Sequence, residues 1–194
     1  SNSWYSGLLR TATNHVVGTG PRLQVLGTDR AVSARVEAAW SRWVKAARFV
    51  DQVRVAFETY WRDGEVFFLR SSRLAHRPVP LDVVLIEADQ VFAPWGYDAI
   101  DASIEDGVRI DTAGRAVEYY VAQQHPGDRV TFRGPTGQWR PASEVIHVFR
   151  ADRPGQVRGL PRLMPALPLF AILRRHTLAT LFADTLHRVG TRST

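Results

Sequence analysis

The spacing of hydrophobic residues changes at Asp63-Gly64, and this change constrains the fold more than any other feature of the sequence. Before it, apolar residues recur every three or four positions, which is typical of amphipathic helices. After it, short apolar runs alternate with turn residues, which is typical of strands. We therefore predict an α+β fold, in which N-terminal helices pack on a mostly antiparallel β-sheet or small barrel and a long C-terminal helix follows.

Three helices are expected before the change of period. The first spans residues 3–15, the second carries Trp40 and Trp43 on its apolar stripe, and the third ends at Asp63. Helices favour short polar residues at their N-caps, and such residues precede the second and third helices: Thr28, Asp29 or Ser33 for the second, and Asp51 for the third. Residues 18–20 read Gly-Thr-Gly, but Leu23 stands where a dinucleotide-binding loop needs its third glycine. We interpret this stretch as a turn into a short strand over 22–26.

Strands are expected after the change, and the chain ends in a helix. A glycine-containing turn at 111–115 lies between two strands and predicts a hairpin. From Leu169 onward, apolar residues describe a long helix, and Pro168 marks a break or restart before it. The apolar stripe of this helix has no following partner in the sequence, which indicates a fragment or packing against another subunit. The strands are predicted at 65–70, 81–87, 104–110, 116–121, 129–132 and 145–149.

The stretch 147–161 joins the last strand to the long helix and is rich in arginine, glycine and proline. Arginine presents a planar fork suited to carboxylate or phosphate, so these residues can bind phosphate or pair with acids of the same or a neighbouring subunit. We favour pairing with acids. Seven residues of this stretch are our candidates for a subunit interface or a connector: Arg150, Asp152, Arg153, Gly155, Gln156, Arg158 and Gly159.

Composition excludes several classes of protein. The 194 residues are 45% hydrophobic and 23% charged, which is a normal globular balance, and they contain no cysteine for a disulfide, a zinc knuckle or a nucleophile. No apolar run is long enough to cross a membrane. The net charge of +6 comes almost wholly from arginine, Lys45 being the only lysine. This charge suits an acidic partner such as nucleic acid. Because the arginines are dispersed among acids, we favour another cause, a GC-rich genome that encodes arginine where others encode lysine.

Residues that could support catalysis are present, but not in a recognised pattern. The six histidines lack metal-binding spacing, and we expect His147, inside a predicted strand, to be structural. Asp101, Glu105, Asp106 and Asp111 cluster in the sequence but do not follow the calcium-loop pattern, so we interpret them as a solvated hairpin face. We predict that the chain is not an enzyme and that it binds no cofactor or metal.

The order of several motifs resembles the lambda-type family of bacteriophage portal proteins, the ring-forming subunits of the head–tail connector. The resemblance extends over nearly all 194 residues. It implies a fold like the wing region of those proteins, with a helical part at 1–64, a β-rich part at 65–150, and a connector with the start of the stem helix at 151–194, in one structural domain truncated at both ends. The matching segments are 14–24, the helix with Trp40 and Trp43, 62–67, 85–91, 106–120 and 141–161.

The resemblance also implies a function. The protein is expected to be a structural subunit of the portal ring, which in this family is usually dodecameric, at the capsid vertex of the virion of a tailed phage or prophage. The ring assembles in the cytoplasm of the bacterial host. Expected partners are further copies of the chain, terminase, the major capsid or scaffold protein and head–tail connector proteins. Double-stranded DNA passes through the full ring. We expect no direct DNA contact here, because the family's tunnel loops lie outside these residues.

Two further hypotheses concern the stretch 147–161, which we call the connector from here on. The alternative function is a nucleic-acid-binding domain that uses the arginine-rich loop 150–158. The dense pattern of arginine and glycine also predicts that Arg158→Ala or Gly159→Val harms ring assembly more than it harms folding of the subunit.

Overall fold

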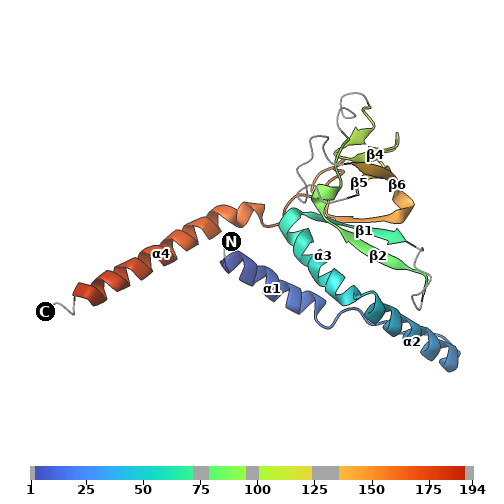
Figure 1. The fold of residues 1–194 in the computed structure, drawn as a ribbon, viewed down its shortest axis with the longest axis horizontal. Helices are drawn as coiled ribbons and strands as arrows, with labels where there is room; N and C mark the ends of the chain where they lie inside the picture. Colours follow the sequence, from blue (N-terminus) through green and yellow to red (C-terminus); the bar gives the residue numbers. More distant parts are fainter. Residues whose placement is uncertain (1–2, 72–78, 95–100, 124–135, 191–194) are drawn as a thin grey trace.

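A computed structural model describes residues 3–71, 79–94, 101–123 and 136–190, with the side chains of 186–190 left out of the description (Figure 1). The α+β prediction is confirmed. The helices are α1 (Ser3–Val17), α2 (Arg30–Ala46), α3 (Phe49–Asp63) and α4 (Leu167–Gly190), with short 3-10 helices η1 (Ala88–Gln90), η2 (Ala142–Glu144) and η3 (Met164–Ala166). The strands are β1 (Glu65–Ser71), β2 (Asp82–Ile86), β3 (Ile104–Glu105), β4 (Val108–Ile110), β5 (Ala116–Ala122), β6 (Gly137–Pro141) and β7 (Val145–Phe149).

The residues that begin and end the helices agree with the predicted ones except at the start of α3. Asp29 caps α2 as predicted, because its Oδ1 accepts the N–H groups of the first turn. The prediction that Asp51 caps α3 is wrong. The cap is Arg48, in the left-handed region with φ of 50°, and Asp51 lies inside the first turn, where its carboxylate pairs with Arg48 Nε at 2.9 Å. Gly64 ends α3 as expected, with φ of 91°.

Two antiparallel sheets form, with strand orders β2-β1-β7 and β3-β4-β5-β6. The hairpin joining β4 and β5 is confirmed. The single strand predicted at 104–110 is wrong, because a turn at Asp106-Gly107 divides it into β3 and β4. Strand β6 was not predicted. The strand expected at 129–132 lies outside the described residues.

The strand predicted at 22–26 is also wrong. The segment forms no sheet, and the N–H of Val25 donates to Glu37 Oε1 at 2.9 Å instead. A side chain of α2 therefore supplies the acceptor that a neighbouring strand would otherwise provide. This bond holds the segment against α2.

The protein is built in three layers, and β1 lies in the middle one (Figure 1). Because successive side chains of a strand point to opposite faces, Phe67 of β1 enters the core between the two sheets, while Phe68 packs with Trp43 of α2 on the other face. The core between the sheets is completed by Ile86, Val91, Val108, Tyr119, Val121 and Val145. Sheet β2-β1-β7 therefore separates the helices from the second sheet.

Helix α4 leaves this body and projects away from it, and only its first turns come near the N-terminal end of α1 (Figure 1). Pro168 does not break the helix but occupies its first turn, where the missing N–H has no helical acceptor to lose. The Tyr5 ring of α1 meets the Phe170 ring of α4 edge-on, with centroids 5.9 Å apart. No helix in the described part of the chain is long and apolar enough to span a bilayer.

We predict that stability depends on Phe67 far more than on apolar residues at the surface. Phe67 is 0% exposed and Val117 of β5 is 44% exposed. Phe67→Ala should lower the free energy of unfolding by about 3–5 kcal/mol, and Phe67→Leu by less, because both leave a cavity between the sheets. Val117→Ala should change it by no more than about 0.5 kcal/mol. Urea denaturation measures all three, and equal losses from Phe67→Ala and Val117→Ala would contradict the described core.

Candidate functional site

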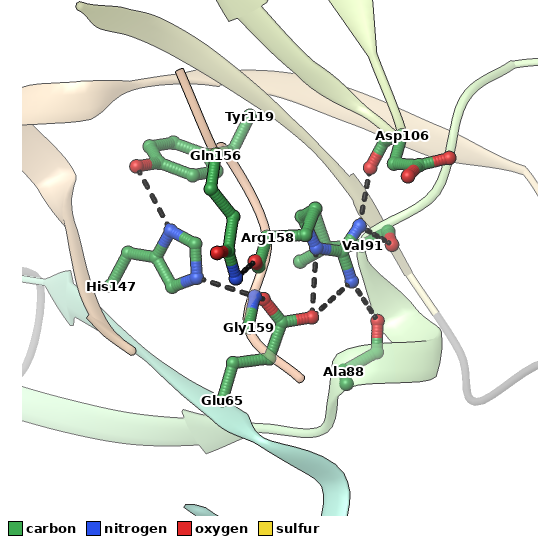
Figure 2. Close-up of polar contacts among 9 residues, drawn as sticks. All are labelled: Glu65, Ala88, Val91, Asp106, Tyr119, His147, Gln156, Arg158 and Gly159. Carbon is green, nitrogen blue, oxygen red and sulfur yellow. Dashed lines mark hydrogen bonds and ion pairs between the residues drawn. The ribbon is translucent and has the colours of Figure 1, made fainter. Parts of the chain in front are cut away.

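A buried carboxylate lies where α3 ends and β1 begins. Glu65 is the first residue of β1, directly after the helix-ending Gly64, and only 3% of the residue is exposed. It lies on the same face of the strand as Phe67, so its side chain points between the two sheets. Figure 2 shows the polar groups that converge on it. An ionised carboxylate is stable in such a place only if donors surround it.

The guanidinium of Arg158 is the principal partner of Glu65. Its Nε and Nη2 both contact Glu65 Oε1, at 2.8 and 2.6 Å. The remaining hydrogens of the fork go to backbone carbonyl oxygens. Nη1 donates to Val91 at 2.9 Å and also to Asp106, and Nη2 donates to Ala88 at 3.1 Å (Figure 2). Each of the three nitrogens of the guanidinium thus has at least one acceptor, an arrangement that the single nitrogen of lysine cannot reproduce.

The second oxygen of Glu65 receives two other donors. Its Oε2 lies 3.0 Å from Nε2 of His147 and accepts the backbone N–H of Gly159 at 2.7 Å. The other ring nitrogen of His147 lies 3.4 Å from the hydroxyl of Tyr119 (Figure 2). A neutral imidazole that donates from Nε2 and accepts at Nδ1 satisfies both contacts. The ring of His147 also stacks between Phe67 and Phe149, with centroid distances of 4.1 and 4.3 Å.

The pKa values in this cluster favour an ionised Glu65 beside a neutral His147. Burial alone would raise the pKa of Glu65, but hydrogen bonds from His147 and Arg158, the charge of Arg158 and the N–H of Gly159 together lower it. Burial lowers the pKa of His147, and the nearby carboxylate opposes that shift only in part. Burial and the charge of Glu65 raise the pKa of Tyr119. The cluster therefore holds one negative and one positive charge, which balance.

Two glycines allow the chain to cross over this corner. A Cβ on Gly159 would lie 2.3 Å from the carbonyl oxygen of Gly64 and 2.7 Å from Cβ of Glu65. A Cβ on Gly64 would lie 2.1 Å from the carbonyl carbon of Leu160. No side chain fits at either approach. The connector is therefore pressed directly onto the junction of α3 and β1, and this contact fixes where the path to α4 begins.

The other candidate residues of the connector lie in its exposed part. Arg150 Nε pairs with Asp152 at 3.2 Å, and the side chain of Arg153 is exposed. Gly155 has φ of 72° in open space. Gln156 folds the loop on itself, since its Oε1 accepts from the Asp152 N–H at 2.8 Å and its Nε2 donates to the Arg158 carbonyl at 2.6 Å. Of the seven candidates, only Arg158 and Gly159 reach Glu65.

These contacts change what we expect of substitutions at Arg158 and Gly159. From the sequence we expected Arg158→Ala or Gly159→Val to harm assembly more than folding. The structure gives both residues buried contacts within their own chain, to Glu65 and Gly64. Removal of Arg158 leaves an uncompensated buried charge, and a side chain at Gly159 collides with backbone. We now expect both substitutions to harm folding of the subunit first.

Sequence reasoning identified Arg158 and His147 but missed Glu65 and Tyr119. One signal was present: Glu65 opens an apolar strand and shares a face with Phe67, a position where an acid must be paired. The expectation that His147 is structural agrees with its place in the cluster. No local pattern marks Tyr119, since its contact with His147 depends on how the two sheets meet.

The cluster is closed to solvent. The side chains of Glu65 and His147 are 4% and 5% exposed. A groove of about 810 Å³, lined almost entirely by apolar side chains, lies on the opposite face of sheet β2-β1-β7 and reaches none of the residues around Glu65. Among the described residues, no group of three histidines or acids is placed to hold a metal ion. The charged groups here fasten parts of one chain to each other.

A closed polar centre beneath a projecting helix is an arrangement suited to a structural subunit. The chain belongs to the lambda family of phage portal proteins, whose family model matches residues 1–187 of the 194. Proteins of this family are structural components of the phage particle, found at the portal vertex of the capsid, where they form an oligomeric ring used in genome packaging. A search of curated proteins found no match.

We predict that Arg158 stabilises the fold and that the exposed Arg153 does not. Arg158→Met should lower the free energy of unfolding by about 3–5 kcal/mol, because Glu65 then remains buried without its cation. Adding Glu65→Gln should recover part of the loss, since it removes the stranded charge. Arg153→Met in the same loop is the matched control and should have little effect. Chemical denaturation measures these variants, and similar small losses from both methionine variants would refute the role of Arg158.

We also predict a stability that declines with acid. Glu65 has a lowered pKa in the folded state, so unfolding takes up a proton once the pH approaches the ordinary value of 4.5. His147 likewise has a lowered pKa, so unfolding takes up a proton below 6.5. Because the unfolded state binds more protons, the stabilisation is complete above pH 6.5 and decreases as the pH falls, by at most about 1.4 kcal/mol per pH unit for each proton.

A substitution of His147 tests this pH dependence. His147→Gln should flatten the decline just below pH 6.5, because its amide can donate to Glu65 but does not titrate. His15→Gln, at an exposed histidine of α1, is the matched control substitution. Denaturation curves across the acid range give the profiles, and an unaltered slope in His147→Gln would exclude His147 as the titrating group.

Proposed function

We propose that this chain is a subunit of the portal ring of a tailed phage or prophage, a ring expected to contain twelve copies. In this proposal the ring assembles in the cytoplasm of the bacterial host and forms the channel for packaging and ejection of double-stranded DNA. It also offers the docking site for terminase and for head–tail connector proteins, and it contacts the major capsid or scaffold protein. The observation that carries the proposal is the family match over residues 1–187.

The geometry supports this role in a specific way. The Glu65 cluster draws on β1, the segment after β2, the turn at Asp106, β7 and the connector, so one centre holds both sheets to the start of the path toward α4. A ring subunit must resist forces between its body and its channel-facing parts. A connector tied at its base by a buried ion pair meets that requirement better than an exposed linker.

The alternative function, nucleic-acid binding through the loop 150–158, has less support. Binding to phosphate requires guanidinium groups that are open to solvent. Arg158 is committed to Glu65 and three backbone carbonyls, and Arg150 is paired with Asp152. Arg150, 61% exposed in its surface pair, and the exposed Arg153 are left to meet a phosphate, and two arginines give weak binding.

Assembly of the full-length protein tests the proposal. We expect light scattering to report a mass many times that of the subunit, and negative-stain images to show closed rings with a central opening. Arg150→Ala together with Arg153→Ala should leave the buried cluster intact, so a loss of ring yield in this double variant would report the subunit-interface role predicted for these two residues. A protein that stays monomeric at high concentration would contradict the proposal. Tight duplex-DNA binding near 50 mM salt that this double variant abolishes would favour the alternative instead.

A further inference from the structure

The apolar groove of about 810 Å³ between the helices and sheet β2-β1-β7 reaches into the core. Its open side is bordered by the end of α1 and by β7, where Val16, Ile146 and Val148 are between 41% and 67% exposed. Its floor consists of side chains that the fold buries almost completely: Trp43, Ala56, Val66 and Val83. The groove is therefore a deep hollow with one open side.

A hollow of this size leaves the core incompletely packed. Protein interiors are packed as densely as organic crystals, and voids larger than one water molecule are few. Side chains that line an unfilled space lose the dispersion contacts that a neighbour would give them. Water fills such a space poorly, because a buried water needs several polar partners and the lining here is almost entirely apolar. An apolar occupant would restore the missing contacts.

The dimensions of the groove suit a small molecule. Ligand sites typically enclose about 300–1,000 Å³ between apolar and aromatic walls, and Trp40, Phe57 and Phe68 belong to this lining. A protein partner would need about 800 Å² of surface on each side. The exposed rim, which consists of a few aliphatic side chains, offers much less than that. Most of the contact area lies inside the groove, where a slender molecule can reach it.

Positive charge lies at the α1 end of the groove. Arg54 of α3 donates to Oδ1 of Asn14 at 3.0 Å and to the carbonyl oxygen of Gly18. It therefore lies beside the loop 18–21, part of which lines the groove. Both acceptors are neutral, and no ion pair among the described residues includes Arg54. Arg22 follows the loop and is exposed, and residues 14–22 contain no acid. An anion at this end would meet charge that is not already neutralised.

We infer that the groove binds one single-chain carboxylic acid, such as a medium-chain fatty acid. The alkyl chain lies over the buried floor, between α3 and β7, and the carboxylate lies at the loop 18–21, where Arg54 and Arg22 supply the positive charge. The site goes beyond the proposed ring, because it is built from one subunit and needs no neighbour. The occupant is a free acid, since a narrow groove with a small rim admits one detached chain but no bilayer surface.

Titration calorimetry of the full-length protein with dodecanoate, below the concentration at which it forms micelles, tests the site. We expect saturable binding of one molecule per subunit. Decanoate should bind more weakly, by about 4-fold for each methylene removed, and dodecylammonium more weakly than dodecanoate because its charge is repelled. Absence of saturable binding would overturn the inference, and equal affinity for the two head groups would overturn the assignment of a carboxylate.

A substitution at the wall locates the chain. Val148→Asp should raise the dissociation constant for dodecanoate by at least about 10-fold, because it places a like charge beside the ligand and removes an apolar contact. The matched control is Val117→Asp, at a strand residue of similar exposure that does not line the groove. Chemical unfolding of both variants shows that they are folded. Unaltered binding in Val148→Asp would exclude this groove as the site.

Substitutions of Arg54 locate the carboxylate. Arg54→Gln should weaken dodecanoate by up to about 5-fold, as for a solvent-screened ion pair, and should leave dodecanol unchanged. Arg54→Lys should retain the difference between acid and alcohol. The control is Arg115→Gln, at an arginine whose side chain is 79% exposed on the β4–β5 hairpin. Equal losses for acid and alcohol in Arg54→Gln would show a structural role only and would refute the placement of the carboxylate.

Two further results separate this inference from its alternatives. The protein should not float with phosphatidylglycerol vesicles, and flotation that Val148→Asp abolishes would overturn the inference in favour of a membrane surface. Rings that bind no dodecanoate would refute the inference and leave the proposed function standing. Binding by a protein that never forms rings would support the site and contradict the proposed function.

Discussion

A carboxylate removed from water must be surrounded by hydrogen-bond donors, and the burial of Glu65 imposes this requirement on the whole subunit. Four donor contacts meet it: two from Arg158, one from His147 and one from the backbone of Gly159. Because His147 lies in β7 and Arg158 and Gly159 lie in the connector, the chain can satisfy the carboxylate only by pairing β7 beside β1 and bringing the connector back over the start of β1. The path of the chain between residues 147 and 159 follows from that need.

The same centre shows why arginine and glycine occur together in the connector. The guanidinium of Arg158 must reach the carbonyl oxygens of Ala88, Val91 and Asp106 as well as the carboxylate of Glu65, while the backbone after it lies almost in contact with Gly64. Gly159 permits that approach. Arg158 therefore supplies the positive charge. Gly159, which has no side chain, lets the backbone approach Gly64 closely enough for the guanidinium to reach its partners. A loop selected only for solubility would need neither.

The sequence predicted those parts of the fold that depend on local chemistry. Helices α1, α2, α3 and α4, the capping role of Asp29 and the end of α3 at Gly64 all follow from periodicity and short-range hydrogen bonds. Strand β6 was missed because Gly137 and Pro141 bound a segment with little strand character of its own, and it pairs because β5 offers a free edge. The Asp106-Gly107 turn was present as a signal but was overlooked between the apolar residues Ile104 and Val108.

Only one member of the ion pair between Glu65 and Arg158 could be predicted from the sequence. Arg158 stood out within its loop, but nothing near it in the sequence indicates Glu65, because the two are 93 positions apart and meet only after the sheets have formed. His147 could be placed in a strand, whereas its stacking between Phe67 and Phe149 depends on strand register. Long-range pairs of this kind are fixed by the fold as a whole, and so Arg158 and His147 were found while their partners Glu65 and Tyr119 were not.

The separation between Glu65 and its partners also sets an order of events during folding. Contacts that close long loops form late, because their loop entropy must be overcome first. In the nascent chain, Glu65 cannot be satisfied until residue 159 has been made, and α4 begins only eight positions later, at Leu167. The exposed apolar residues of α4, from Leu167 to Phe182, are therefore synthesised after every residue of the Glu65 cluster. These apolar side chains therefore leave the ribosome after the residues that satisfy Glu65, so the body of the subunit can fold before they are available for contact.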